Sequence, residues 1–469
     1  MLTSIGNRLT PSAPVEITYG AQPTALGRKF ATIFAHRAAT GGLGMDYEVL
    51  EVINVGDPVA AQAEVEEFAG VGSQAVEMAL AFINANALVG RSNYPAFRIV
   101  LLPNAETSFG PADEALQATK ALRTDLFVSP YPADETVQFE KLRDWANFLS
   151  GPDRDLNGQF GSFVQLGFDG TIAEAVALNL NTRTTLVGHL QDTNDAAVAG
   201  QTGTTEDGSN VITAIADTSE IYRGATITGA GIPANTVVDK VQNGQIVISA
   251  NATADASGVA LTIQNVKSNT VPEIAAAHAA AMLQSAFPYN PLASVEIGGL
   301  QAPRKAEDVI VRDPFGASEQ LLQAGISPLT VLPGNTVGFI RTVTTFRTLP
   351  GNIAVTAYFD WQQIVTLYDF REICYQVTQL PPFNNNPGGT KASAEKAARL
   401  KDEILAEAFI FEELEAFQNV KALAPFFQVE VRTDVRGRFD FKIPVDVIPG
   451  LHVIAGNIQA VSDLGEFNL

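Results

Sequence analysis

Residues 427–447 read FQVEVRTDVRGRFDFKIPVDV. Apolar and polar side chains alternate along two runs, which are joined by a turn-like segment that ends in glycine. The apolar positions are Val429, Val431, Phe439, Phe441, Ile443 and Val445. A period of two places these side chains on one face of a strand pair, so the stretch predicts a β-hairpin with one buried and one wet face. The edges of such a hairpin can pair with strands from other chains, which points to assembly rather than chemistry.

A second strand pattern lies near the start of the chain and has no hairpin partner nearby. Its residues are Val15, Glu16, Ile17, Thr18 and Tyr19, which follow two prolines at positions 11 and 14. The residues alone leave two interpretations open. The segment is either an edge strand of the first domain or a strand that pairs with another subunit.

Length, composition and charge limit the class of protein. The chain has 469 residues, of which 46% are hydrophobic, and this predicts two to four units with real cores. A net charge of −21 argues against binding to nucleic acid or to an anionic membrane. Cys374 is the single cysteine, so no internal disulfide forms, which fits a reducing compartment. The start has no signal-peptide pattern and no apolar stretch is long enough for a bilayer, so we expect a soluble, cytoplasmically made product.

Strand and helix patterns alternate from residue 28 to 190 and again from 271 to 335. The expected strands cover 30–35, 47–55, 97–102, 125–129, 163–168, 184–190, 294–297, 308–311 and 329–332. The expected helices cover 58–68, 113–123, 135–149, 272–286 and 318–325, and two more begin at 73 and 171. This alternation predicts an α/β domain with a largely parallel sheet covered by helices.

Residues 191–270 interrupt this pattern. Small and polar residues dominate, and strands are expected at 210–216, 225–228, 236–241, 245–249 and 259–264. Asn243-Gly244 stands between two of them and predicts a hairpin turn. The segment therefore reads as a small all-β domain inserted at the surface of the α/β domain.

The remainder of the chain predicts an α+β unit. A strand is expected over 337–347, a helix follows Asp360, and a long helix runs from about 390 to 417. That long helix carries an acidic stretch, Glu407, Glu412, Glu413 and Glu415. A solvated helix face explains it most simply, and an electrostatic contact with a basic partner is the alternative.

Motifs for catalysis or metal binding are missing from the sequence. The four histidines stand far apart, and no Gly-x-Ser-x-Gly, His-Glu-x-x-His or phosphate-loop pattern is present. Residues 153–158 match the first half of a calcium loop, but Val164 occupies the position of the bidentate glutamate. We therefore predict no catalytic, cofactor or metal site.

Three stretches in their order resemble the tail sheath protein of contractile bacteriophages, in the branch related to phage Mu. The first runs from Glu51 to Pro58 and continues, after a helix, with Gly-Val-Gly-Ser at 70–73. The second is Ile340 to Thr345, followed by an aromatic helix from Trp361. The third is Asp440 to Gln459.

This resemblance implies a subtilisin-like α/β sheath domain, named for its strand order and without protease activity. Its expected boundaries are 21–190 and 271–335, with the small all-β domain inserted at 191–270. An α+β assembly domain would span 336–457, and linker arms would occupy 1–20 and 458–469.

The resemblance also implies how the subunit works. The arms, Val15 to Tyr19 and Ile458, Gln459, Ala460 and Val461, would add strands to sheets of neighbouring copies, and the hairpin would be a docking sheet. Copies would form stacked rings or a helix around a tail tube protein, between baseplate and tail terminator proteins. Assembly in the host cytoplasm and contraction in the virion tail, with no cofactor, would follow.

Two other classes stay open at this stage. One is a hydrolase on a subtilisin-like scaffold, and the other is an adhesin that acts through the β insert. Polymers seen by electron microscopy, covalent labelling by a serine-hydrolase probe, and glycan binding by the insert would distinguish the three classes.

Overall fold

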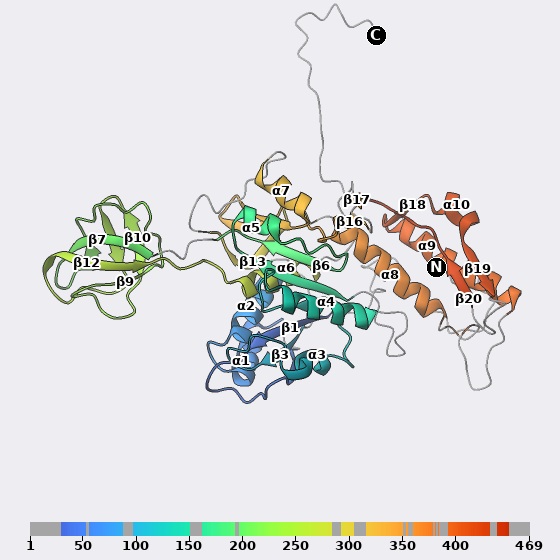
Figure 1. Cartoon of the computed structure of the whole chain (residues 1–469), viewed down its shortest axis with the longest axis horizontal. Helices are drawn as coiled ribbons and strands as arrows, with labels where there is room; N and C mark the ends of the chain where they lie inside the picture. Colours follow the sequence, from blue (N-terminus) through green and yellow to red (C-terminus); the bar gives the residue numbers. More distant parts are fainter. Residues whose placement is uncertain are drawn as a thin grey trace, which may run out of the picture.

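The structure is a computed structural model that describes residues 30–52, 56–87, 97–150, 162–192, 197–283, 292–303, 316–349, 353–354, 360–378, 380, 383, 393–431 and 439–449. Three bodies follow one another across Figure 1. The small all-β insert lies at one end, the α/β body in the middle, and a helical unit with short strand pairs at the other end.

A nine-stranded mixed sheet forms the centre of the α/β body. Its strand order is β13-β15-β14-β6-β5-β4-β1-β3-β2. The strands are β1 Ala31–His36, β2 Val49–Val52, β3 Phe97–Leu102, β4 Leu126–Val128, β5 Phe163–Phe168, β6 Thr185–His189, β13 Glu296–Gln301, β14 Ser327–Leu332 and β15 Thr336–Phe339. The six strands from β14 to β3 are parallel, whereas β2, β13 and β15 pair antiparallel at the two edges. The predicted α/β fold class is confirmed.

Helices cover both faces of this sheet, as expected for a parallel α/β arrangement. They are α1 Pro58–Ala69, α2 Gln74–Ala87, α3 Glu114–Ala118, α4 Thr136–Ser150, α5 Ile172–Ala177, α6 Val271–Leu283 and α7 Ala317–Ala324. Alternate residues of β1 separate the two cores: Ile33 packs with α1, α2 and α6, and Phe34 packs with α3, α4, α5 and α7. The period of two along each strand produces these two apolar layers.

The helix α6 lies directly on the sheet, and every residue from Ile274 to Leu283 is buried. Two glycines allow this approach. A Cβ at Gly167 would lie 2.2 Å from the Val271 carbonyl oxygen, and one at Gly188 would lie 2.8 Å from the His278 ring. The alanine-rich sequence of α6 therefore reflects close packing between helix and sheet.

Capping residues close the ends of several helices. Asp57 accepts from Val59 N and Ala60 N, and Thr171 forms a capping box with Glu174. Gly325 closes α7 in the left-handed region, at φ 82°.

Several expected elements are shorter than the sequence predicts. The strand expected over 210–216 is only Val211–Ile212, and the helix expected over about 390–417 is described as Ala394–Glu413. The helix expected over 113–123 is only Glu114–Ala118: Ala112 and Asp113 adopt left-handed backbone angles before it, and turn residues follow it from Thr119. The strand expected over 47–55 covers Val49–Val52, and residues 53–55 lie outside the described residues. The strand expected over 337–347 ends at Phe339 and continues only as isolated bridges at Val343 and Thr344.

The insert consists of two three-stranded antiparallel sheets around a core of its own. Their orders are β10-β11-β8 and β7-β12-β9. The strands are β7 Ala197–Thr205, β8 Val211–Ile212, β9 Thr226–Thr228, β10 Val238–Gln242, β11 Gln245–Ile248 and β12 Ala256–Gln264. Asn243-Gly244 forms the β10–β11 turn, as predicted. The sequence did not predict β7, because its small residues lack the usual strand signal.

The two connections of the insert meet at one point on the α/β body. Asp192 Oδ2 accepts from Ser268 N at 2.6 Å, and Lys267 Nζ lies 2.6 Å from Asp169 Oδ2. Burial raises the pKa of Asp169, and the Lys267 ammonium opposes that rise. The chain therefore leaves and returns within hydrogen-bonding distance.

The C-terminal unit combines two long helices with short strand pairs. Its elements are β16 Thr348–Leu349, β17 Ile353–Ala354, α8 Trp361–Thr378, α9 Ala394–Glu413, β18 Phe417–Gln418, α10 Val420–Leu423, β19 Gln428–Val431, β20 Phe439–Lys442 and β21 Asp446–Val447. One stripe of α9, which includes Leu400 and Ile404, is buried. Within the ranges given above, no helix is long and apolar enough to cross a bilayer.

Candidate assembly interface

The predicted hairpin is present as the pair β19–β20. Val429 lies opposite Phe441 and Val431 lies opposite Phe439, so these four side chains share one face. Val429 and Phe439 pack against the C-terminal core. Phe441 stays 45% exposed, although it stands on the same face. The apolar face of the hairpin therefore extends beyond the core that it covers, on the β20 side.

The second run of the hairpin is not one continuous strand. β20 ends at Lys442, and the chain resumes strand structure only at β21, which pairs with β18 rather than with β19. Pro444 stands in the break and cannot donate a ladder hydrogen bond. Ile443 and Val445 lie in this connection and are partly buried against the C-terminal core.

An aromatic cluster holds the helices and strands of this unit together. The Phe370 ring centroid lies 5.2 Å from that of Phe411 and 4.9 Å from that of Phe417, and the Phe411 and Phe417 centroids are 5.0 Å apart. Cys374 lies in the same core, and burial raises the pKa of its thiol to about 12. The thiol is therefore an apolar packing group at neutral pH.

The helix α8 belongs to two cores at once. Its first half inserts Trp361 and Ile364 into the core of the α/β body, where the Trp361 ring centroid is 4.5 Å from that of Phe163. Its second half contributes Phe370 and Cys374 to the C-terminal core. Because one continuous helix is packed at both ends, the hairpin unit is fixed to the body.

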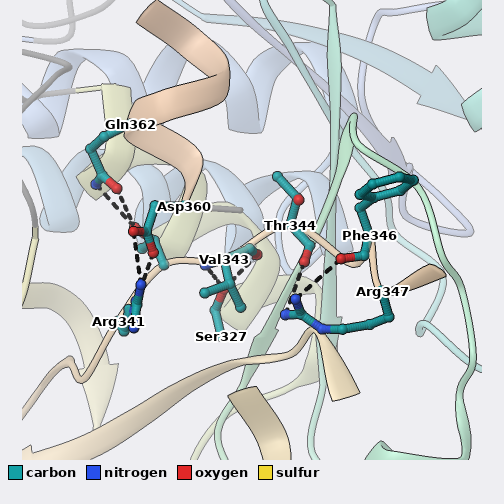
Figure 2. Close-up of polar contacts among 9 residues, drawn as sticks. Ser327, Arg341, Val343, Thr344, Phe346, Arg347, Asp360 and Gln362 are labelled. Atoms are coloured by element: carbon teal, nitrogen blue, oxygen red, sulfur yellow. Dashed lines mark hydrogen bonds and ion pairs between the residues drawn. The ribbon is translucent and has the colours of Figure 1, made fainter. Parts of the chain in front are cut away.

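An ion pair secures the start of α8. Arg341 Nε lies 2.7 Å from Asp360 Oδ1, and Arg341 Nη2 lies 2.9 Å from Asp360 Oδ2 (Figure 2). The side chains are only 18% and 3% exposed. Two parallel bonds from a planar guanidinium fix direction as well as distance. The sequence predicted Asp360 only as a helix cap, since nothing local reveals a partner 19 residues away.

The segment before α8 is bonded to the sheet by its backbone. Ser327 Oγ accepts from Val343 N and donates to Val343 O, and Thr345 N donates to Thr185 O (Figure 2 shows Ser327 and Val343). Arg347 donates to the carbonyl oxygens of Thr344 and Phe346. This stretch, which carries the family-like Ile340 to Thr345, thus joins the body to α8.

A second ion pair joins α8 to the body further along the helix. Arg123 contacts Glu372 through two bonds of 2.9 and 3.1 Å. Burial raises the pKa of Glu372, while Arg123 acts in the opposite direction. The two residues are 249 positions apart, so no sequence pattern could have found them.

The predicted arms lie outside the described residues. This holds for Val15, Glu16, Ile17, Thr18 and Tyr19 at the start, and for Ile458, Gln459, Ala460 and Val461 at the end. The structure therefore brings together four of the predicted docking residues on one hairpin face, places two in the following connection, and does not describe the strands expected to dock there.

Each histidine in the described ranges is hydrogen-bonded to a carbonyl or amide oxygen rather than to a serine hydroxyl, which a hydrolase would need. His36 Nδ1 pairs with Pro103 O, His189 Nε2 with Gly170 O, and His278 Nδ1 with Gln165 Oε1. Burial lowers the pKa of His189 to about 4 and that of His278 to about 3. Across the described ranges, no group of three or more His, Cys, Asp or Glu residues could hold a metal ion.

Comparisons with known proteins gave matches among solved structures alone. No protein-family model and no curated protein matches the chain. A cryo-EM structure of the anti-feeding prophage baseplate is similar, with a TM-score of 0.44, 10% identity, and 97% of this chain and 100% of that chain covered.

Two crystal structures of sheath tail proteins are also similar. For that of Desulfitobacterium hafniense the TM-score is 0.44 and the identity 10%, over 92% of this chain and 100% of that one. For that of Listeria innocua the TM-score is 0.49 and the identity 8%, over 90% and 92%. The Mu-related branch stays a prediction.

Proposed function

We propose that this chain is the structural subunit of a contractile tail sheath, which polymerises by exchanging strands between subunits. The observation that carries the proposal is the β19–β20 hairpin. A two-stranded sheet is marginal on its own, and a third strand beside β20 would cover the exposed ring of Phe441. Residues 15–19 have the strand pattern that such a position requires.

The packing of α8 supports the mechanical part of the proposal. Because α8 is buried in both the body and the C-terminal core, the subunit moves as one unit, and the arms act as the hinges between copies. Contraction then changes contacts between copies and needs no nucleotide, since the extended polymer is held in a metastable state.

The partners follow from this role. The polymer surrounds a tail tube protein, ends at baseplate and tail terminator proteins, and drives the tube through the bacterial envelope for genome ejection. Assembly in the host cytoplasm is part of the same proposal. The subunit itself binds neither nucleic acid nor membrane, consistent with its net charge of −21.

Electron microscopy of the purified chain tests the proposal. We expect cylinders or helical polymers for the full chain, and loss of polymers with an unchanged folded subunit when residues 1–20 are deleted. A full chain that remains monomeric at high concentration would contradict it.

The other two classes gain no specific support from the part of the chain that the structure describes. The bonded partners of His36, His189 and His278 are not serines, and the insert carries a single aromatic residue, Tyr222, for stacking on a sugar.

A further inference from the structure

The carboxyl group of Asp169 and the amine of Lys267 are in contact where the insert returns to the α/β body. Lys267 Nζ lies 2.6 Å from Asp169 Oδ2. Asp169 directly follows β5, which ends at Phe168, and Lys267 follows β12, which ends at Gln264. The contact therefore joins a central strand of the large sheet to the chain that leaves the insert.

A second carboxyl group, that of Asp192, is held beside this contact. The Asp192 N–H donates to the backbone carbonyl oxygen of Asp169 at 3.0 Å. Its Oδ2 accepts from the N–H of Ser268, the neighbour of Lys267, at 2.6 Å. Asp192 is fully buried, and its charge acts to raise the pKa of Asp169. Two acidic side chains and one amine thus meet at the point where the insert is attached.

The surroundings of Asp169 favour a neutral carboxyl group. Its side chain is only 13% exposed, and the preceding residue, Phe168, packs in the core and stacks on His189, with ring centroids 6.0 Å apart. Burial is the main cause that raises the pKa of Asp169. Transfer of one proton across the 2.6 Å contact, from the ammonium to the carboxylate, gives a neutral amine beside a neutral carboxylic acid.

We propose that Lys267 and Asp169 condense to an isopeptide bond, with Asp192 as the group that transfers the proton. The neutral Lys267 Nζ attacks Cγ of the protonated Asp169, so that a C–N bond forms and one C–O bond breaks. Asp192 takes a proton from the attacking nitrogen and returns it to the leaving hydroxyl group. One water molecule departs, and the step requires no oxidant and no further reactant.

The bond closes a loop that contains the whole insert, since its two residues are 98 positions apart. A cross-link of this kind lowers the entropy of the unfolded chain. It also fixes the return connection of the insert to β5, while the outgoing connection follows β6, the parallel neighbour of β5. A pull on the insert is then carried into two adjacent central strands by covalent bonds.

The test measures the mass of the denatured full chain and maps its peptides by tandem mass spectrometry. Lys267→Arg keeps the positive charge, but its guanidinium does not lose a proton and forms no amide. We expect the original chain to be lighter by one water than this variant, after allowance for the substitution. A digest should contain a branched peptide with both Asp169 and Lys267, and the Tm of the original chain should exceed that of the variant.

Asp192→Asn tests the proton transfer. The amide oxygen still accepts from Ser268 N, so the fold is kept, and we expect most of the chain to retain its full mass. Lys141 and Asp113 supply a matched control within the same digest. They are also 2.6 Å apart, but the Asp113 side chain is 35% exposed, and we expect these two residues in separate linear peptides.

The outcomes decide the inference without reference to polymers, so the proposed function stands or fails separately. An original chain of full mass, with Lys267 in a linear peptide, would overturn it. The same mass deficit in Lys267→Arg would also overturn it, because the link would then lie elsewhere. Complete linkage in Asp192→Asn would show that the assignment of Asp192 is wrong.

Discussion

The insert and the C-terminal unit both contain short antiparallel strands, and they complete their sheets in different ways. The insert pairs two three-stranded sheets over a core in which Ile246 and Ile263 are fully buried. The C-terminal unit has only two-stranded pairs among the described residues, and its hairpin leaves Phe441 exposed. The insert therefore buries its own apolar core, whereas the hairpin leaves part of its apolar face exposed.

Under the proposed function, this difference makes the hairpin the place where a neighbouring copy associates. The insert joins the α/β body where Asp192 and Ser268 are hydrogen-bonded. Its core shares no residue with the other cores. The hairpin, by contrast, is joined to the body through α8.

The largest expected effect comes from Phe411→Ala. Removing this buried ring from the cluster with Phe370 and Phe417 should destabilise the C-terminal unit by about 3–5 kcal/mol. Hydrogen exchange measured region by region is the readout, and the insert should keep its protection. Ile246→Ala is the counterpart, expected to loosen the insert by about 2–5 kcal/mol and to leave polymers intact. If either variant reduced protection in both regions, the insert and the C-terminal unit would not be independent in stability.

As the pH falls, the α/β body should lose stability at a higher pH than the insert does. Burial lowers the pKa of His189 and His278 to about 4 and about 3, and residues 197–264 include no histidine. The unfolded chain binds these protons below about pH 6.5, and the folded chain does not. Stability is therefore complete above that pH and falls as the pH drops towards 4, by about 1.4 kcal/mol per pH unit for each histidine.

Urea unfolding at pH 8 and pH 5, followed by hydrogen exchange in each region, checks this expectation. The body should lose stability at pH 5 while the insert retains its protection. Equal loss in both regions would show that the buried histidines are not the cause.

The smallest effect on the free subunit is expected for Phe441→Ser. Because the ring is already 45% exposed, the free energy of unfolding should change by less than about 1 kcal/mol. If a neighbouring strand covers this ring, the concentration needed for polymerisation should rise by about tenfold, since 1.4 kcal/mol corresponds to a factor of ten. Val176→Ser on α5 alters a side chain of 41% exposure away from the hairpin and should leave this concentration unchanged.

Local patterns were sufficient to predict much of the fold. Continuous apolar strands such as β3 and β5 follow from neighbouring residues. The strand β7 was not predicted, because Ala, Gly and Thr gain their strand preference only from pairing with β12. The proline at 444 was itself a local signal for the break in the strand. The alternation of apolar and polar residues on either side made the run look continuous.

Part of the candidate interface was also predictable, because it depends on residues that are neighbours in the sequence. The apolar face of Val429 to Phe441 is a property of neighbouring residues, and its register follows from the period of two. The contacts of Arg341 with Asp360 and of Arg123 with Glu372 depend on the arrangement of distant elements. Each of these charges looks like an ordinary surface residue until the fold surrounds it.

The attachment of the insert at Asp192 and Ser268 has a consequence for how the gene can change. Because Asp192 and Ser268 meet through one hydrogen bond, the coding segment between them has both of its ends at a single place on the subunit. One in-frame recombination event can add, exchange or delete that segment without altering the residues that α8 and the hairpin use. Related chains should then differ most in this module.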